Sequence, residues 1–127
     1  MQKCEYELAV FYNAYYCLIL YPIEYTFQMY LIEKTVEFDK WLRKLKDIRA
    51  KAIILFRIQK VENDGHFGDC ELVGDGIREL KIDFAKGYRI YLKEKDRRVI
   101  ILLVGGDKST QQKDIKKAKE ILHQINN

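Results

Sequence analysis

Residues 76–110 read GIRELKIDFAKGYRIYLKEKDRRVIILLVGGDKST, and their pattern predicts three strands and the start of a helix. Apolar and polar residues alternate in residues 79–84 and again in residues 88–93, the period of two that predicts a strand. The link at residues 85–87 is short, so these two strands are expected to pair antiparallel. Residues 99–104 are aliphatic throughout, which indicates a central strand covered on both faces.

A turn rich in glycine and charge follows the central strand. Residues 105–108 combine two glycines, which allow a tight and unusual backbone path, with an acid and a base. Ser109 lies three residues before Gln112, the spacing of a capping box. We therefore expect a helix to begin at this turn.

The two alternating strands are expected to place their polar residues on one open face of the sheet. Lys81, Arg89, Tyr91 and Lys93 share that face, and the charged pair at residues 107–108 emerges at the end of the neighbouring strand. Cations, an acid and a phenol can thus converge on an anionic ligand. Open faces of antiparallel sheets are usually only solvated, and the alternation alone favours that simpler interpretation.

Two segments carry a resemblance to a known family. ELKIDFAKGYRIYL (residues 79–92) and VIILLVGGDKSTQQKDIKKAKEIL (residues 99–122) resemble the HigB-like, addiction-module killer branch of the RelE/ParE toxin superfamily. In that branch a Gly-Tyr-Arg strand and a Gly-Gly-Asp-Lys-Ser turn recur together. The resemblance extends over nearly everything from about Met29 to the C-terminus. It implies an α+β fold in which an antiparallel-rich sheet packs against an N-terminal helical hairpin and a C-terminal helix.

Residues 1–28 differ in character from the rest. Residues 8–23 contain no charged side chain, but the run is too short and too rich in tyrosine for a convincing membrane span, and a signal peptide fits poorly. We interpret residues 1–28 as an N-terminal extension, with Met29 as the natural start and the preceding run as translated upstream sequence. A genuine amphipathic or membrane-surface extension is the alternative. Residues 29–127 form the expected RelE/ParE-like toxin domain.

Composition and charge agree with one ordinary domain. The chain has 127 residues, of which 48% are hydrophobic and 33% charged. Its three scattered cysteines suit neither a disulfide framework nor a metal cluster, so a cytoplasmic location is expected. Residues 1–28 hold one lysine and three glutamates, which leaves residues 29–127 with 22 bases against 16 acids and a net charge of +6. A positive surface favours polyanions, although lysine-rich helix faces are often only solvated.

Helical periodicity fills the region before the three strands. After a short strand at residues 30–34, Thr35 is placed to cap a helix that turns Phe38, Trp41 and Leu42 inward. Asp47 is placed to cap a second helix. The tight link between them predicts an antiparallel hairpin with a positive outer surface, and a helix-turn-helix DNA reader is the competing interpretation. A strand at residues 69–73 and a final helix near residues 110–125 complete the order β-α-α-β-β-β-β-α.

The catalytic options are narrow. His66 and His123 are the only histidines and are far apart in the chain, so neither a histidine pair nor a metal site is expected, and no cofactor is implied. RNA carries its own nucleophile, because a ribose 2′-hydroxyl can attack the adjacent phosphate when an enzyme aligns it and stabilises the charge that develops. Removing one preorganised donor of that kind typically costs about 10²- to 10³-fold in rate.

The resemblance assigns roles to particular residues. Arg89 is similar to the family's phosphate-stabilising arginine, and Lys81 and Lys108 occupy basic positions that line the same site in relatives. Glu79 or Asp107 is the candidate base, and a simpler interpretation pairs Glu79 with Lys81 as surface charges, worth at most about 1 kcal/mol. The candidate RNA contacts are Tyr91, Lys93, Ser109 and Thr110.

The resemblance leaves two classes of function open. The preferred one is the toxin of a type II toxin–antitoxin system that acts as a metal-independent, ribosome-dependent mRNA endonuclease and inhibits translation. The alternative is a non-catalytic growth inhibitor that binds DNA gyrase. The implied partners are a cognate antitoxin of helix-turn-helix type, mRNA on the ribosome and ribosomal RNA, with no membrane partner.

Overall fold

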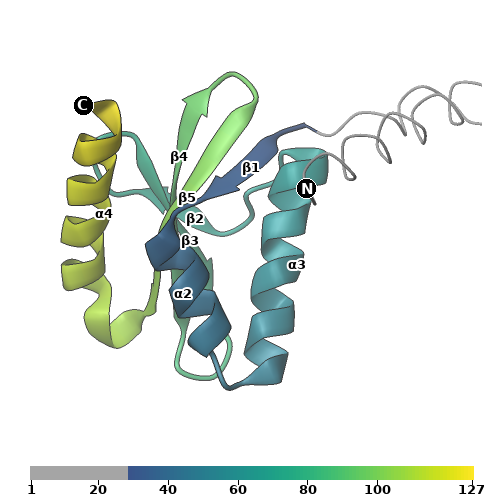
Figure 1. Ribbon diagram of the computed structural model, residues 1–127. Helices are drawn as coiled ribbons and strands as arrows, with labels where there is room; N and C mark the ends of the chain where they lie inside the picture. The colour runs from purple at the N-terminus through teal and green to yellow at the C-terminus, as the bar shows by residue number, and fades with distance from the viewer. Residues whose placement is uncertain (1–28) are drawn as a thin grey trace, which may run out of the picture.

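The computed structural model describes residues 29–127, so the interpretation of residues 1–28 lies outside the described residues. Along this part of the chain the elements are β1 (Leu31–Lys34), α2 (Val36–Lys44), α3 (Ile48–Asp64), β2 (Cys70–Leu72), β3 (Ile77–Ile82), β4 (Tyr88–Asp96), β5 (Val99–Asp107), the 3₁₀ turn η2 (Lys108–Thr110) and α4 (Gln111–Asn126) (Figure 1). The predicted order of strands and helices is confirmed. No helix in residues 29–127 is both long enough and apolar enough to cross a bilayer.

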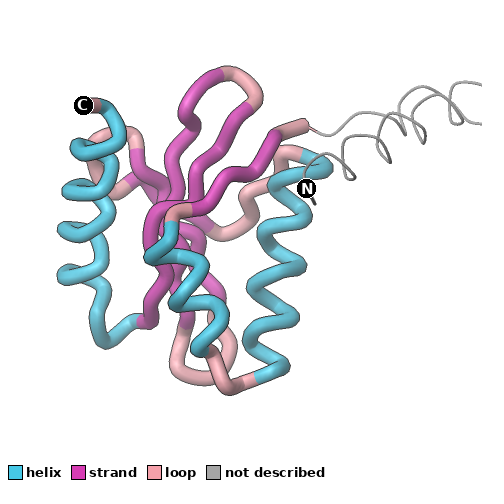
Figure 2. Tube along the Cα trace, in the orientation of Figure 1, coloured by secondary structure: helices cyan, strands magenta, loops and turns pink. Residues whose placement is uncertain are grey.

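The strands form one sheet, whose order within the described residues is β1-β5-β4-β3-β2 (Figure 2). The hairpins β2–β3, β3–β4 and β4–β5 are antiparallel, as their short connections predict. β1 joins the outer side of β5 in parallel, with Leu31 opposite Val99. The chain between these two parallel strands contains the helical hairpin and β2, β3 and β4, and β5 has a neighbour on each side.

Helices cover both faces of the sheet (Figure 1). On one face Leu80, Ile90 and Leu92 form a core cluster with the buried residues of α2 and α3. On the other face Tyr91 and Leu103 pack with buried residues of α4. The expectation of an open sheet face is therefore wrong, because α4 folds back over the face that carries the polar residues of β3 and β4. The expectation that β5 is covered on both faces is confirmed.

α4 buries one side against the sheet. Ala118, Ile121 and Leu122 are buried, whereas Ile125 is 39% exposed. Ile125 lies in the last turn of α4, next to the C-terminus. The helix thus contacts the sheet through its middle turns.

The capping residues of the helical hairpin are confirmed. The Thr35 hydroxyl accepts the Phe38 N–H at 3.0 Å, and the Asp47 carboxylate accepts the N–H groups of Arg49 and Ala50 at 3.0 and 3.1 Å. Gly65 ends α3 in the left-handed conformation, with φ of 66°. These local signals set where α2 and α3 begin and where α3 ends.

α3 presents two apolar stripes, and one of them packs on the sheet. Ile54 and Val61 are buried in the core, while Ile48 and Leu55 on the neighbouring stripe are exposed. Arg57 of α3 does not join the positive outer surface expected for the hairpin: its guanidinium donates to the carbonyls of Lys81, Phe67 and Asp69 at 2.6 to 3.2 Å. Arg57 therefore holds the loop before β2 against the end of β3.

The two glycines of β5 serve close packing and not an unusual backbone path. Both lie within the strand, and a Cβ on Gly105 would stand 2.1 Å from the Trp41 ring. A Cβ on Gly106 would collide with the carboxylate of Asp114. Glycine at these two positions lets α2 and α4 approach β5 from opposite faces.

The capping box predicted at Ser109 does not form. Asp107 caps the 3₁₀ turn instead, with its carboxylate accepting the backbone N–H of Ser109 at 2.9 Å and the Ser109 hydroxyl. α4 begins two residues later than Ser109, at Gln111. The 3₁₀ turn shifts the helix start because Asp107 is the better acceptor for these first donors.

Candidate active site

The candidate residues of β3 and β4 lie on the sheet face toward α4. Lys81 is opposite Arg89 in the β3–β4 register, and Glu79 is opposite Tyr91. Cross-strand neighbours on one face have adjacent side chains. The prediction that Lys81, Arg89 and Tyr91 share a face is therefore confirmed, although α4 covers part of it.

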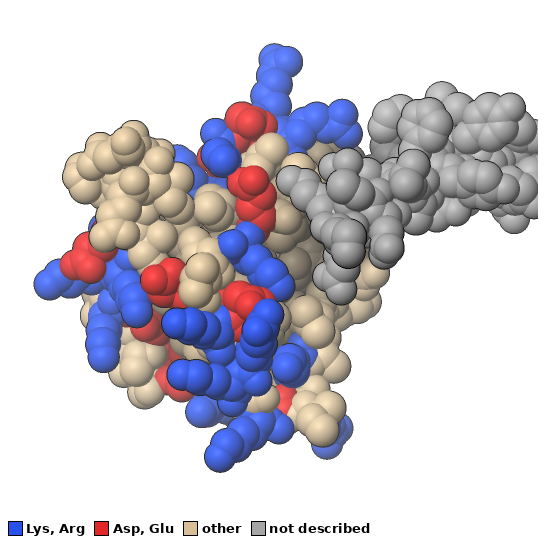
Figure 3. All heavy atoms as spheres, viewed as in Figure 1, with Lys and Arg blue, Asp and Glu red and all other residues tan. Residues whose placement is uncertain are grey.

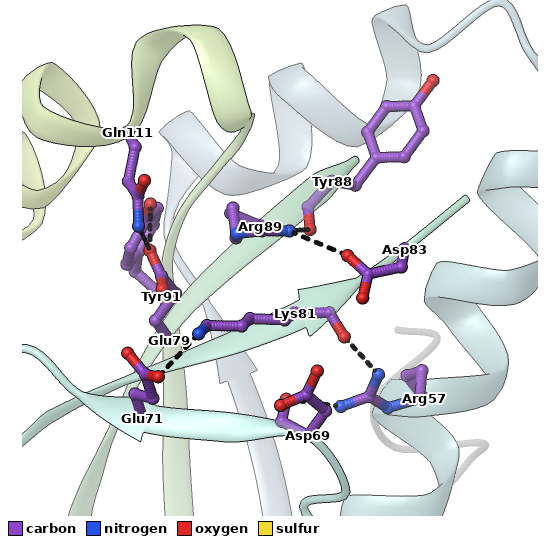
Figure 4. A network of polar contacts seen from close by, with 10 residues as sticks. All are labelled: Arg57, Asp69, Glu71, Glu79, Lys81, Asp83, Tyr88, Arg89, Tyr91 and Gln111. Atoms are coloured by element: carbon purple, nitrogen blue, oxygen red, sulfur yellow. Dashed lines mark hydrogen bonds and ion pairs between the residues drawn. The ribbon is translucent and has the colours of Figure 1, made fainter. Parts of the chain in front are cut away.

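Arg89 is a nearly buried cation, with 6% of its surface exposed. The Arg89 Nη1 donates to the backbone carbonyl of Tyr88 at 2.9 Å. The same nitrogen lies 3.8 Å from the exposed Asp83 carboxylate (Figure 4). Its Nε has no hydrogen-bond partner among residues 29–127. This Nε is buried, so the guanidinium has a donor that the described residues do not use, and the acid opposite Nη1 is exposed to solvent.

Lys81 pairs with Glu71 of β2, with 2.7 Å between the ammonium and the carboxylate (Figure 4). This hydrogen bond raises the pKa of Lys81 and lowers the pKa of Glu71. The simpler interpretation, in which Lys81 pairs with Glu79 on the surface, is wrong because Glu79 is buried. Lys81 is the more accessible cation beside Arg89, with 22% of its side chain exposed.

Glu79, Tyr91 and Gln111 form a buried polar network beneath the start of α4. The Tyr91 hydroxyl and the Gln111 amide each donate to Oε2 of Glu79 at 2.8 Å (Figure 4). Glu79 and Tyr91 are both fully buried, and Oε1 of Glu79 has no partner among the described residues. Burial, assisted by the hydrogen bond to Glu79, raises the pKa of the Tyr91 phenol well above its ordinary value. Tyr91 and Glu79 thus join the sheet to α4 in this conformation.

Gln111 is the member of this network that the sequence did not indicate. It is the first residue of α4, and a polar residue there is ordinary at a helix start. Its bond to Glu79 spans 32 positions of the chain, so only the folded arrangement reveals it.

The turn after β5 lies at the same end of the sheet as Arg89. Tyr88 is opposite Asp107 and Arg89 is opposite Gly106 in the β4–β5 register. The hydrogen bonds from Ser109 lower the pKa of Asp107, whose other oxygen is 3.7 Å from the Lys86 ammonium. The exposed Lys108 packs its aliphatic stem over Gly87. In this register Asp107 shares the face of Tyr88, so the ionised carboxylate stands at the same end of the sheet as Arg89 but on the other face.

The remaining candidates are placed differently. Thr110 is exposed, and its hydroxyl donates to the Asp114 carboxylate. Lys93 is opposite Ile77 at the far end of β3, and its ammonium donates to the Asp75 carbonyl at 3.3 Å. Lys81 and Arg89 are thus adjacent on one face, the turn at residues 107–110 lies at the same end of the sheet, and Lys93 lies at the far end of β3.

The arrangement suits the binding of an anionic group at Arg89 and Lys81, with charged groups at the rim. Within residues 29–127 no three side chains of His, Cys, Asp or Glu are grouped so that they could hold a metal ion. The chemistry available to the described residues is hydrogen bonding, charge stabilisation and proton transfer.

A solved structure with a similar fold is a doubly substituted mutant of the E. coli toxin RelE in the free state. The TM-score is 0.60 and the sequence identity 16%, and the alignment covers 72% of this chain and 96% of that one. The predicted RelE-like fold class is thereby confirmed, with its five-stranded sheet in residues 29–127 and helices on both faces.

One relative has a higher sequence identity to this chain than the RelE structure has. A protein of Haemophilus influenzae is 53% identical over 94 residues, which is 74% of this chain and 94% of the relative. Residues 40–124, which include β3, β4, β5 and most of α4, match the family described as phage-derived protein Gp49-like (DUF891). The chain therefore belongs to the Gp49-like family of phage-derived proteins.

Proposed function

We propose that this protein is the toxin of a type II toxin–antitoxin system and that it acts in the cytoplasm as a metal-independent, ribosome-dependent mRNA endonuclease. The resemblance of its strand and turn motifs to HigB-like killer proteins supports the proposal, as does the fold that it shares with the toxin RelE. The net charge of +6 in residues 29–127 is also suited to a polyanionic substrate.

The Arg89 guanidinium is the observation on which the proposal depends. It is nearly buried, its Nε is unpartnered among the described residues, and its carboxylate neighbour Asp83 is 3.8 Å away and exposed. A phosphate oxygen that replaced Asp83 would meet a preorganised donor in a site with little water, where charge stabilisation is strongest. Lys81, its cross-strand neighbour, would add a second positive charge.

In this proposal the protein aligns the RNA and stabilises charge while the substrate supplies the nucleophile. The 2′-hydroxyl oxygen attacks the adjacent phosphorus, its proton passes to a base, and the 5′-oxygen of the next nucleotide leaves and takes up a proton. Asp107 is the remaining candidate base: hydrogen bonds from Ser109 keep it ionised, and it lies at the same end of the sheet as Arg89, on the Tyr88 side of the strand. Lys108 is the candidate proton donor or phosphate contact at the same rim. Glu79 is too deeply buried to serve as the base in this conformation.

A translation assay with purified components tests this function. Added protein should cut mRNA on intact ribosomes, leave a 2′,3′-cyclic phosphate, and continue to do so when free divalent metal is chelated to the extent that the ribosome tolerates. Intact mRNA together with unimpaired translation at toxic doses would exclude the endonuclease.

One observation favours the alternative of a non-catalytic DNA gyrase inhibitor. Tyr91 and Glu79, two of the candidate site residues, are fully buried under α4 and so are not available to a substrate in this conformation. Induction in cells separates the two functions, because a gyrase inhibitor would damage DNA before translation declines. Early loss of translation with cleaved mRNA would support the endonuclease.

The proposed function also requires an antitoxin encoded nearby, and we expect a helix-turn-helix protein. The positive surface of residues 29–127 offers electrostatic complementarity to an acidic partner. Co-expression of the neighbouring gene should abolish toxicity and yield a stable complex. A harmless product whose gene has no such neighbour would count against the toxin.

A further inference from the structure

A pocket of about 490 Å³ lies at the end of the molecule where the link between α2 and α3 meets the turn between β3 and β4. Leu45 and Ala85 supply apolar wall, and Tyr88 is part of the lining. Lys44 and Lys46 from the α2–α3 junction and Lys86 from the β3–β4 turn are the lysines of the pocket. None of the candidate catalytic residues lines this pocket. It is therefore a second concave and basic feature of the protein.

The positive charge of the pocket is only partly balanced. The one acid in its lining, Asp47, uses its carboxylate to cap α3 through the N–H groups of Arg49 and Ala50. Lys86 lies 3.7 Å from Asp107 and 5.9 Å from the centre of the Tyr88 ring. Lys44 and Lys46 are exposed and make no ion pair with another of the described residues. Figure 3 shows lysine and arginine side chains gathered over α2 and the lower end of this face.

The pocket and Arg89 are on opposite sides of the same strand end. Tyr88 points into the core under α2 and α3 and reaches the pocket, and Arg89, the next residue, points to the α4 side. The Arg89 guanidinium donates to the Tyr88 carbonyl, and both Asp83, its counter-ion, and Lys86 belong to the β3–β4 connection. A flexible polyanion that passes around this connection would meet Arg89 on one side and the lysines on the other.

We propose that the pocket of Lys44, Lys46 and Lys86 binds backbone phosphates of an RNA chain and so extends the substrate contact beyond Arg89. This inference rests on the proposed function, since it concerns RNA held at the same end of the molecule. Lysine ammonium groups act as mobile point charges that suit a sequence-independent phosphate contact. The RNA is either the message itself or ribosomal RNA, which share this phosphodiester chemistry.

The test is binding of RNA by the full chain in which Lys44→Gln and Lys46→Gln are combined. A fluorescein-labelled, unstructured 20-nucleotide RNA is titrated between 50 and 200 mM salt, and binding of ribosomes without mRNA is measured in parallel. A plot of the logarithm of the association constant against the logarithm of salt concentration should be less steep for the variant, by about 1.4, because two phosphate contacts are lost. The unsubstituted protein should therefore bind more tightly than the variant at 50 mM salt, and this difference in affinity should shrink roughly sevenfold by 200 mM. If the variant binds the oligonucleotide more weakly, the message is the ligand of the pocket. If only its affinity for ribosomes falls, the ligand is ribosomal RNA.

The chain offers a matched control in Lys113→Gln combined with Lys116→Gln. These exposed lysines lie on α4, on the other side of the sheet from the pocket, and their loss changes the net charge equally. Only the pocket variant should lose RNA affinity, and Lys44→Arg with Lys46→Arg should retain it. In the cleavage assay the pocket variant should raise KM more than it lowers kcat.

Several results would overturn the inference. Equal affinity and equal salt dependence for the pocket variant and its control, with both RNA ligands, would remove the phosphate site. Unchanged RNA binding with loss of the antitoxin complex would identify the pocket as a protein contact instead. The proposed function is tested separately, by whether Arg89→Ala abolishes cleavage. The failure of the proposed function can therefore be told apart from the failure of the phosphate site.

Discussion

Among single residues, Arg89 is the one whose surroundings most directly suggest a chemical role. A guanidinium that is 6% exposed must be compensated by polar partners, and its Nε has none among residues 29–127. The bond to the Tyr88 carbonyl fixes the plane of the guanidinium. The residue thus combines a fixed orientation with unused donor capacity, which a stable structural ion pair would not need.

Arg89→Ala should therefore abolish most mRNA cleavage, by about 10²- to 10³-fold if it removes one preorganised donor. Arg89→Lys should restore little activity, because a point charge cannot reproduce a two-pronged guanidinium contact. Cleavage rates on ribosomes and toxicity in cells measure the effect.

Asp83→Ala is the matched control for Arg89. It breaks the same 3.8 Å ion pair but leaves the guanidinium in place, and the Asp83 side chain is 68% exposed. Cleavage by Asp83→Ala should stay close to that of the unsubstituted protein. If both variants lose activity equally while remaining folded, the ion pair is structural and the phosphate role of Arg89 is wrong.

Tyr91 gives a second prediction at this scale, for stability against pH. Burial raises the pKa of its phenol, so the folded protein holds this proton more tightly than the unfolded chain. The contribution of this protonated phenol to the free energy of unfolding is fully present below the ordinary tyrosine pKa of 10.0 and is lost as the pH rises above it. Tyr91→Phe should cost about 1–3 kcal/mol at neutral pH, because Glu79 loses a donor in a buried site.

Urea unfolding at pH 8 and pH 10.5 measures this effect as a difference between the two proteins. The stability advantage of the unsubstituted protein over Tyr91→Phe should shrink at the higher pH. A difference that does not depend on pH would show that the Tyr91 phenol is not shielded by α4 in solution.

At the scale of elements, β5 is the strand on which the helices converge. Trp41 of α2 lies against Gly105 on one face, and Asp114 of α4 lies against Gly106 on the other. These contacts let two helices approach one strand at successive residues. They also explain why an otherwise aliphatic strand has no side chains at these two positions.

Gly105→Ala should consequently destabilise the protein by about 1–3 kcal/mol, because the added methyl would overlap the Trp41 ring. The same substitution in a Trp41→Leu background should cost less, since the smaller side chain leaves room. Urea midpoints followed by circular dichroism provide the four values of this double-mutant cycle. Strictly additive costs would mean that Trp41 and Gly105 do not contact each other in solution.

At the scale of the whole molecule, the two core clusters lie within residues 29–127. One joins α2 and α3 to the sheet, and the other joins α4 to it. Helices on both faces bury every strand of the β3–β4–β5 hairpins, so the described residues have the layered organisation of an independent domain.

We propose on this basis that a chain starting at Met29 folds and is as toxic as the full chain. Its thermal midpoint should be within a few degrees of that of the full chain, and mild proteolysis should remove residues 1–28 first. Aggregation or inactivity of the truncated chain, together with protection of residues 1–28, would contradict this proposal.

The strands and helices of this protein can be predicted from the amino-acid sequence, because their signals are local. Alternation over a few residues specified β3 and β4, and an unbroken aliphatic run specified β5. Thr35, Asp47 and Gly65 set helix ends through bonds to residues at most a few positions away. The strand period also placed Lys81, Arg89 and Tyr91 on one face without any knowledge of their neighbours.

What covers that face, and which polar groups meet on it, depends on long-range packing that the local pattern does not encode. Alternation distinguishes two faces of a sheet but does not tell whether a distant helix lies on the polar one, and α4 covers it through Ala118 and Ile121. The pairs Glu79–Gln111 and Lys81–Glu71, and the pocket between two remote turns, join segments that have no local relation in the chain. Side-chain partners of this kind depend on long-range packing, and therefore the burial of Glu79 and the partly unsatisfied Arg89 emerged only when the chain was folded.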